Sequence, residues 1–286
     1  MMQVWMNGSF RDLDAASIPV TDRGFLLGDG FFETMRAHEG KIAWLDAHME
    51  RLDFHAEQIE FPLDLLPATK DVAEIVATLF EQVRRKDAVV RLTVSRGSGE
   101  RGLLPPADPD PTILITVSPF EPVDPGVGLK LFTSQKVRRN ANSVAGGIKS
   151  INYLDNIAAK QEAHSYRGDD AIILSADGNV AETTAANIFG IKGDTLWTPD
   201  EDTGILCGLA RGFVLGWAEE TGREVDFEPK TPEMLKELDA VFTANALQGL
   251  RIVDKVDGLV IGVPAMTFFA ELAQMVETSL CEGIVV

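Results

Sequence analysis

Lys149 and Glu182 are the two residues whose types and surroundings point most directly to chemistry. Lys149 follows the glycine pair 146–147 and precedes a predicted helix, and Glu182 comes about thirty residues later, before a predicted strand. A lysine amine can hold an aldehyde as a Schiff base, and a carboxylate can keep a pyridine nitrogen protonated. The pair therefore favours a pyridoxal phosphate site over other chemistry.

Neither residue supports that interpretation alone. A single lysine in a loop is usually a solvated charge, and a single acid before a strand is usually exposed. The four histidines, at positions 38, 48, 55 and 164, share no metal-ligand spacing, so no metal site is expected. The cofactor hypothesis depends on the elements that position the pair and on the motifs around it.

Hydrophobic spacing predicts both strands and helices along the 286 residues. Strands are predicted at 4–6, 31–37, 41–45, 88–95, 111–117, 129–134, 171–175, 188–191, 195–197 and 240–243. Helices are predicted after a cap at Asp46 and at 69–86, 153–166, 209–220 and 264–280. Three prolines at 119–125 favour an extended connection. We expect an N-terminal domain at 1–120, a linker at 121–128 and a C-terminal domain at 129–286.

Composition excludes several classes of partner. The formal net charge of −18 and the pI near 4.6 argue against a nucleic-acid partner. Cys207 and Cys281 are too far apart in sequence for a CxxC motif, which fits a reducing compartment. The first residues show no signal-peptide pattern, and no apolar stretch approaches the ~20 residues of a membrane span. A cytoplasmic protein without membrane contact is expected.

A glycine-rich run offers a competing interpretation. Residues 97–102 satisfy the pattern GxGxxG and follow a predicted strand. A dinucleotide-binding fold requires a helix next, whereas Leu103-Leu104-Pro105-Pro106 follows. The run is therefore predicted to be a loop.

The segment after Glu182 carries a dense set of motif positions. It reads Glu182-x-Thr184-x-x-Asn187-Ile188-Phe189, then Leu196-x-Thr198, then Leu206-x-Gly208-Leu209-x-Arg211. This resembles the signature of the class IV aminotransferases, the fold-type IV pyridoxal phosphate enzymes. The blocks at 21–34 and 48–52 extend the resemblance upstream. It implies two α/β domains, the first smaller, with the cofactor between them, and a homodimer.

The same resemblance implies roles for individual residues. Lys149 and Glu182 are expected to be catalytic and to bind the cofactor. Arg51 is expected to bind the cofactor phosphate, because a guanidinium stays charged and grips phosphate with two donors. Further phosphate contacts are expected at the backbone amides of Leu209, Ala210, Asn245 and Ala246.

Two of the implied contacts depart from the family pattern. Ala246 stands where many relatives have a hydroxyl residue, so one side-chain contact to the phosphate is absent from this chain. Tyr153 follows Lys149 at a spacing one residue shorter than in branched-chain members. Its role is open between a cofactor contact and packing.

Two loops favour one reaction within the family. The run 95–102 and the segment 245–247 resemble 4-amino-4-deoxychorismate lyases, which release pyruvate and 4-aminobenzoate. Arg101 also falls where D-amino-acid transaminases hold the substrate carboxylate, but their accompanying histidine would be at Leu103. Thr34, Arg101 and Leu247 are the candidate substrate contacts.

The alternatives are a transaminase acting on a D-amino acid, a branched-chain amino acid or an (R)-amine, and a degenerate cofactor-binding protein. The transaminase would use the same cofactor residues, so those residues do not separate it from the lyase. Intact Lys149, Arg51 and Glu182 disfavour the degenerate protein.

Overall fold

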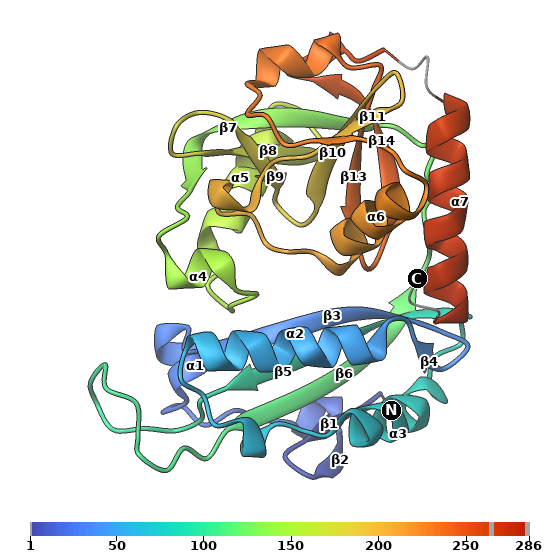
Figure 1. Ribbon diagram of the computed structural model, residues 1–286. Helices are drawn as coiled ribbons and strands as arrows, with labels where there is room; N and C mark the ends of the chain where they lie inside the picture. The colour runs from blue at the N-terminus through green and yellow to red at the C-terminus, as the bar shows by residue number, and fades with distance from the viewer. Residues whose placement is uncertain (1, 263–265, 284–286) are drawn as a thin grey trace. The chain divides into compact units, whose positions relative to one another are not determined.

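The computed structural model describes residues 2–262 and 266–283, which fall into two compact units (Figure 1). The N-terminal unit comprises the chain up to Pro122, the segment Ile148–Asn152 and the end of the last helix from Leu280. The C-terminal unit comprises Val123–Gly147 and Tyr153–Ser279. Lys149 therefore belongs to the N-terminal unit, although it follows the proline-rich stretch in sequence.

The N-terminal unit is built on a six-stranded antiparallel sheet of order β2-β1-β6-β5-β3-β4. The strands are β1 (Gln3–Met6), β2 (Ser9–Asp12), β3 (Gly30–His38), β4 (Lys41–Ile42), β5 (Asp87–Ser95) and β6 (Thr112–Phe120). The helices are α1 (Arg23–Leu27), α2 (Leu45–Gln58) and α3 (Thr69–Phe80), with short 3-10 turns at Leu13–Ala15 and Leu63–Leu65.

Alternation along the strands gives this sheet two different faces. One face carries Phe31, Met35 and Ala37 of β3 and packs against the apolar sides of α2 and α3 as one buried core. The other face carries the intervening residues of β3 and β5. Of the residues described below, Phe32, Thr34 and Arg91 stand on that second face. Glu33 stands on the first face, where it contacts α2.

The lysine segment is held against the start of β3. The Phe32 amide donates to the Lys149 carbonyl at 2.9 Å, and the Ile151 amide donates to the Gly30 carbonyl at 3.1 Å. The Asn152 side-chain amide adds a bond to the Gly28 carbonyl at 2.8 Å. These bonds fix the backbone on both sides of Lys149.

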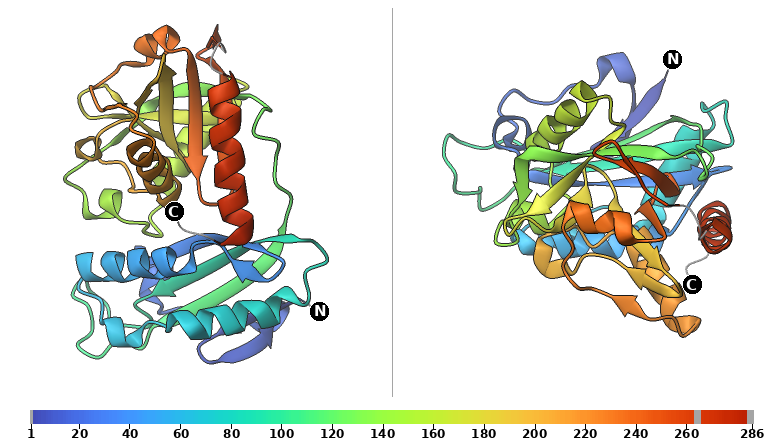
Figure 2. Two further views of the ribbon diagram at one scale, coloured as in Figure 1. Left: turned by 45° about the vertical axis from the view of Figure 1, so that its right-hand side comes forward. Right: turned by 90° about the horizontal axis from the view of Figure 1, so that it is seen from above.

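The C-terminal unit contains a nine-stranded sheet with main path β12-β11-β10-β13-β14-β7-β8-β9, and β15 pairs with β14. Its strands are β7 (Leu129–Arg139), β8 (Asp170–Ser175), β9 (Val180–Thr183), β10 (Asn187–Lys192), β11 (Thr195–Trp197), β12 (Val225–Asp226), β13 (Ala240–Asn245), β14 (Gly249–Val256) and β15 (Leu259–Val260). Since β9 also pairs with β10, six strands close into a ring. Figure 2 shows the curled sheet from two further directions.

The C-terminal unit also contains helices. They are α4 (Val144–Gly147), α5 (Leu154–Ser165), α6 (Leu209–Glu220) and α7 (Met266–Glu282), with 3-10 turns at Glu201–Thr203 and Pro232–Glu237. Packing of α5 on β7 and β8 buries Ala159, Ala163, Ala171 and Ile173. No helix in the described part of the chain is long and apolar enough to cross a bilayer.

Several element predictions are confirmed and others are wrong. The helix at 209–220 and the strand at 195–197 have the predicted bounds. The predicted cap at Asp46 is wrong, because α2 starts at Leu45 after Trp44, which has a left-handed φ of 52°. The helix from 69 ends at Phe80 rather than 86, and the strand from 41 ends at Ile42. The predicted start of the last helix at 264 lies outside the described residues.

Candidate active site

Lys149 lies half-buried between two buried neighbours, Ile148 and Ser150. Its Nζ is 4.6 Å from the ring centroid of Phe32, which stands opposite it on β3. An ammonium or amine over an aromatic face at this distance is a favourable contact. The ring and the paired backbone therefore give the lysine a defined place on the second face of the N-terminal sheet.

Arg91 shares this place and was not among the residues predicted from sequence. Its Cζ is 3.7 Å from the Phe32 ring centroid, and its Nε donates to Thr93 Oγ1 at 3.2 Å. In the β3–β5 register Arg91 stands directly opposite Thr34. The signal was available: Arg91 is a single cation within the apolar run 88–94. The structure thus places Lys149 and Arg91 at one aromatic ring, and the predicted Thr34 stands opposite Arg91 in the sheet.

Arg51 lies on α2 and forms a two-point ion pair with Glu33 of β3. Nε of Arg51 is 2.8 Å from Oε1, and Nη2 is 2.6 Å from Oε2. Oε2 of Glu33 is also 2.8 Å from Nδ1 of His48, within hydrogen-bonding distance. The predicted phosphate-binding arginine is therefore already held by a carboxylate on one edge of its guanidinium.

The charges in this group follow from burial and pairing. Burial alone would raise the pKa of Glu33, but the Arg51 charge and the His48 hydrogen bond outweigh it and hold the pKa well below its usual range. Burial lowers the pKa of His48, so its imidazole is neutral at pH 7. Burial likewise lowers the pKa of His55 to about 4. The Lys149 charge also lowers both histidine pKa values, so the lysine and α2 share one electrostatic environment.

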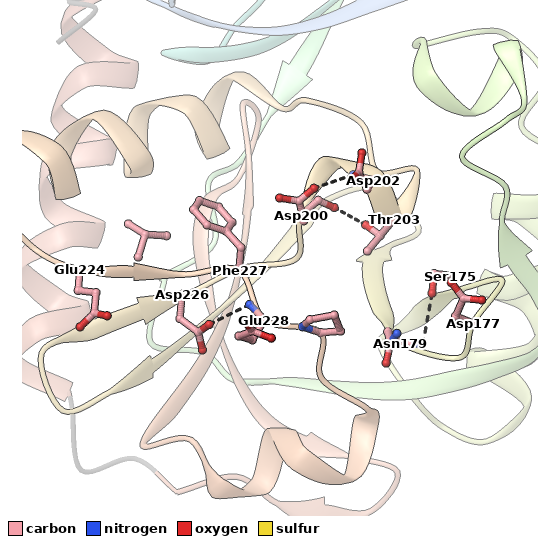
Figure 3. Close-up of a pocket in the computed structure, with 12 residues that line it drawn as sticks. Ser175, Asp177, Asn179, Asp200, Asp202, Thr203, Glu224, Asp226, Phe227 and Glu228 are labelled. Atoms are coloured by element: carbon pink, nitrogen blue, oxygen red, sulfur yellow. Dashed lines mark hydrogen bonds between the residues drawn. The ribbon is translucent and has the colours of Figure 1, made fainter.

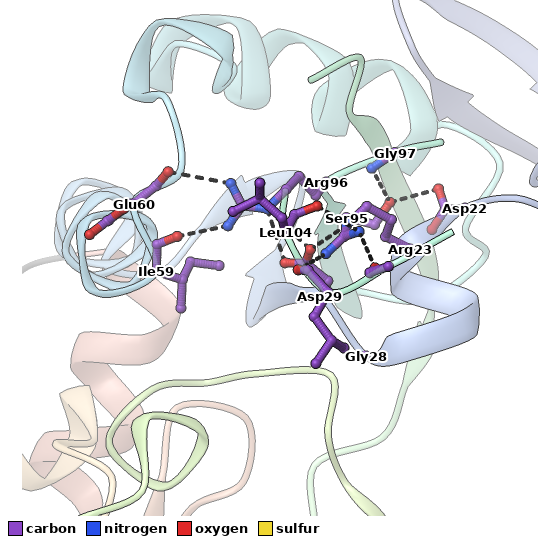
Figure 4. A network of polar contacts seen from close by, with 12 residues as sticks. Asp22, Arg23, Gly28, Asp29, Ile59, Glu60, Ser95, Arg96, Gly97 and Leu104 are labelled. Carbon is purple, nitrogen blue, oxygen red and sulfur yellow. Dashed lines mark hydrogen bonds and ion pairs between the residues drawn. The ribbon is translucent and has the colours of Figure 1, made fainter. Parts of the chain in front are cut away.

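Arg101 lies in an exposed loop between β5 and β6. The loop is anchored by Arg23, whose Nη1 and Nη2 donate to the carbonyls of Gly102 and Leu103 at 3.1 and 2.9 Å. Nε of Arg23 pairs with Asp29 at 2.7 Å, as the network in Figure 4 shows. The prediction that residues 97–102 form a loop is confirmed, since β6 is the next element.

Glu182 lies within β9 of the C-terminal unit, with its carboxylate held from two sides. Oε1 is 2.8 Å from Nε of Arg139, and Oε2 accepts from the Leu206 amide at 3.3 Å. The residue is 6% exposed. An arginine partner and a backbone donor both favour the ionised form of a carboxylate. This arrangement suits a group that must remain an anion.

The start of α6 provides the amides expected to meet phosphate. Gly208 is its N-cap and supplies no side-chain cap, so the first-turn amides of Leu209 and Ala210 have no intrahelical partner. Such an end attracts anions. A Cβ on Gly208 would lie 2.2 Å from Asn187 Oδ1, so only glycine fits there. Asn187 in turn holds the Leu206 carbonyl through Nδ2 at 2.8 Å.

Asn245 organises the turn between β13 and β14. Its Oδ1 accepts from the amides of Leu247 and Gln248 at 3.0 and 2.7 Å, and its Nδ2 donates to the Ala185 carbonyl at 3.2 Å. Asn245, Ala246 and Leu247 are half-buried. The turn is thereby tied to the loop that follows Glu182.

The predicted residues fall into two sets by unit. Thr34, Arg51, Arg101 and Lys149 lie in the N-terminal unit. Tyr153, Glu182, Leu209, Ala210, Asn245, Ala246 and Leu247 lie in the C-terminal unit, where Tyr153 is the half-buried N-cap residue of α5. Amine, carboxylate, guanidinium and helix-end amides are all present, and this donor set fits pyridoxal phosphate.

An open pocket in the C-terminal unit contains none of the predicted site residues. Its volume is about 650 Å³, and six of the residues that line it are acids (Figure 3): Asp177, Asp200, Asp202, Glu224, Asp226 and Glu228. Side chains of this charge would repel a phosphate. The pocket is therefore not a candidate for the cofactor.

Comparisons with known proteins agree on one family. The profile described as amino-transferase class IV matches residues 30–256. A provisionally assigned branched-chain-amino-acid aminotransferase of Methanocaldococcus jannaschii is 35% identical over 91% of this chain and 90% of its own length. An aminodeoxychorismate lyase of Bacillus subtilis is 32% identical over 85% of this chain and 80% of its own length.

A solved structure gives the same result. The branched-chain aminotransferase of Thermoproteus uzoniensis with norvaline superposes with a TM-score of 0.87 at 25% identity. The match covers 99% of this chain and 95% of that chain.

Proposed function

We propose that this chain, which belongs to the class IV aminotransferase family, eliminates pyruvate from 4-amino-4-deoxychorismate and releases 4-aminobenzoate. Members of the family are pyridoxal phosphate enzymes, and the predicted cofactor, family and α/β fold of type IV are confirmed. The substrate is a small amino compound. The choice of lyase over transaminase is the proposal.

The observation that carries it is the loop after β5. Its sequence, Ser95 to Gly102, resembles that of the lyases, and the B. subtilis relative is named as a lyase. Side-chain contacts anchor this run: Ser95 Oγ donates to Asp22 at 2.7 Å, and Arg96 Nε pairs with Asp29 at 3.1 Å. Side chains of the run itself therefore help to fix its backbone path.

The proton transfers are assigned to Lys149. The cofactor, when bound, supplies the electron sink. The lysine amine removes the proton from the ring carbon that bears the amino group, and the bond from the neighbouring carbon to the enolpyruvyl oxygen breaks. The lysine ammonium then protonates the methylene carbon of the departing enolate, which becomes pyruvate, and the ring becomes aromatic. Glu182 keeps the proton on the pyridine nitrogen.

The remaining assigned residues bind the cofactor or the substrate. Arg51 and the amides of Leu209, Ala210, Asn245 and Ala246 are assigned to the cofactor phosphate, and Tyr153 to the cofactor. Thr34, Arg101 and Leu247 are assigned to the substrate. We add Arg91, because its guanidinium is fixed on the Phe32 ring beside Lys149 and the substrate carries two carboxylates.

Product analysis tests this assignment. The protein is mixed with aminodeoxychorismate and, in separate reactions, with D-alanine or L-leucine plus 2-oxoglutarate. Pyruvate arises from both aminodeoxychorismate and D-alanine, so 4-aminobenzoate and the two enantiomers of glutamate are measured. The lyase proposal requires 4-aminobenzoate that depends on the enzyme and is lost in Lys149→Ala. Rapid glutamate formation without 4-aminobenzoate would overturn it.

A transaminase is the second candidate, favoured by the M. jannaschii relative, which is named for branched-chain amino acids. It would use Lys149, Glu182 and the phosphate contacts in the same way. L-glutamate from L-leucine would support a branched-chain enzyme, and D-glutamate from D-alanine would support a D-amino-acid enzyme.

A homodimer is also proposed. Five large apolar side chains are strongly exposed on α1 and the anchored loop: Phe25, Leu26, Leu27, Leu103 and Leu104. Arg23 binds the loop carbonyls and so holds the two segments together. Exposed apolar clusters of this kind often mark association surfaces. Light scattering should give a dimer that Leu103→Asp weakens, and a monomer in the unaltered protein would contradict this.

A further inference from the structure

Glu33 links the side chains of Arg51 and His48 into one buried group in the N-terminal unit. Its two carboxylate oxygens contact Arg51, at 2.8 Å from Nε and 2.6 Å from Nη2. One of them also contacts Nδ1 of His48 at 2.8 Å. The Glu33 and His48 side chains are completely buried, whereas the Arg51 side chain retains 10% exposure.

The elements bring these residues together without distortion. Glu33 lies between Phe31 and Met35 on the same face of β3, and that face packs against the helices. His48 and Arg51 are three residues apart on α2, so they project from the same side of the helix. The contact therefore depends on the β3–α2 packing that also builds the core.

The group has one arrangement of protons. Burial would raise the Glu33 pKa, but Arg51 and His48 hold it well below its usual range, so the carboxylate is ionised. Burial keeps His48 neutral. An ionised carboxylate has only acceptors, so His48 must carry its proton on Nδ1 and donate it to Glu33. One negative charge, one positive charge and one neutral donor are thus locked together.

This pairing also sets the orientation of Arg51. Nε and Nη2 form one edge of the planar guanidinium, and that edge contacts Glu33. The edge formed by Nη1 consequently points away from Glu33. A long side chain fixed in this way loses little further freedom when an anion binds its other edge, and such preorganisation increases affinity.

We propose that Glu33 and His48 are positioning residues that orient Arg51 for the cofactor phosphate. The inference rests on the proposed role of Arg51 and adds the two residues that act through it. Glu33 opposes part of the arginine charge, so its contribution is orientation rather than attraction. Its loss should weaken binding of a ligand with a phosphate more than binding of the same ligand without one.

Cofactor-free full-length protein is titrated with pyridoxal phosphate and, separately, with pyridoxal, and absorbance and fluorescence give both dissociation constants. Glu33→Gln keeps the size of the side chain and removes its charge. It should weaken pyridoxal phosphate about tenfold and pyridoxal less than about twofold. His48→Gln should act in the same direction by a smaller factor, and it serves alone if Glu33→Gln does not fold.

Glu162→Gln is the matched control. Glu162 is a buried glutamate of the C-terminal unit that accepts from Ser134 Oγ at 2.7 Å, and it is not among the residues assigned to the cofactor or the substrate. Its substitution should leave the ratio of the two dissociation constants unchanged. An equal loss for both ligands in Glu33→Gln, or no loss, would overturn the inference by assigning Glu33 a structural role only.

Arg51→Gln separates this inference from the function on which it rests. If Arg51→Gln leaves the ratio unchanged, Arg51 does not bind the phosphate and the proposed role itself fails. If Arg51→Gln reduces the preference for the phosphorylated ligand and neither Glu33→Gln nor His48→Gln does, only the positioning inference fails. If all three variants reduce the preference for the phosphorylated ligand, both the role of Arg51 and the positioning inference are supported.

Discussion

Arg139 and Glu182 form a largely buried ion pair in the C-terminal unit, with Nε 2.8 Å from Oε1 and side-chain exposures of 14% and 8%. The arginine in turn donates from Nη1 to Asn156 Oδ1 at 3.2 Å. Asn156 binds the Thr184 carbonyl at 2.6 Å, two residues beyond Glu182. The carboxylate is thus fixed both by its partner and through the backbone that follows it, which suits the role proposed for it beside the pyridinium nitrogen.

Glu182→Gln should lower kcat on the order of a hundredfold while changing KM little, because an amide does not hold a proton on the pyridine nitrogen. Steady-state kinetics with a saturating cofactor concentration measure both constants. Glu219→Gln, at an exposed position of α6, is the control and should match the unaltered enzyme. An unchanged kcat in Glu182→Gln would remove this residue from the mechanism.

Arg91→Leu should raise the KM for aminodeoxychorismate by about tenfold or more, because a charge-assisted bond to a carboxylate is lost. Arg91→Lys should give an intermediate value, since lysine keeps the charge but not the flat stacking surface on Phe32.

Arg101→Leu provides the comparison for Arg91, because Arg101 lies in an exposed loop rather than on the sheet. Its effect on KM should be smaller. If Arg101→Leu raises KM and Arg91→Leu does not, the carboxylate contact belongs to the loop and the assignment of Arg91 is wrong.

His55 should make stability depend on pH. Its folded-state pKa is about 4, below the ordinary 6.5, mainly because the ring is buried. Between these values the unfolded chain binds more protons, so stability is complete above 6.5 and falls as the pH falls. Lowering the pH from 7 to 5 should cost about 2 kcal/mol through this residue, at roughly 1.4 kcal/mol per pH unit.

Urea unfolding of cofactor-free protein at the two pH values measures the effect. His55→Leu should reduce the loss of stability between pH 7 and pH 5 by that amount, whatever its absolute stability. If both proteins lose the same free energy of unfolding between pH 7 and pH 5, the folded protein binds the His55 proton as readily as the unfolded chain, and the lowered pKa is wrong.

Local signals in the sequence were sufficient for some elements and insufficient for others. The helix at 209–220 was predictable because apolar residues recur at helical spacing after a glycine. The strand β14, Gly249–Val256, was not predicted, since Arg251, Asp254 and Lys255 interrupt its apolar pattern. Glu182 was expected before a strand and lies inside one, because β9 has only four residues and is recognisable only from its partners.

The candidate site divides in the same way. The motifs alone predict the lysine, the glutamate and the helix whose amides are assigned to the phosphate. The pairing of the lysine segment with β3 could not be predicted, because it joins residues more than a hundred positions apart and no local pattern encodes it. Of the Glu33–His48–Arg51 group, the sequence shows only that a histidine and an arginine lie three residues apart on one predicted helix. Its buried carboxylate partner required the fold.

Trapping the cofactor on the chain tests the central claim most directly, namely that Lys149 carries pyridoxal phosphate. The holoenzyme is reduced with borohydride, digested and analysed by mass spectrometry, with Lys149→Ala treated in parallel. The account predicts a stable phosphopyridoxyl group on the peptide that contains Lys149, and no specific label in the variant. A label on another lysine, or none on the cofactor-loaded protein, would contradict it.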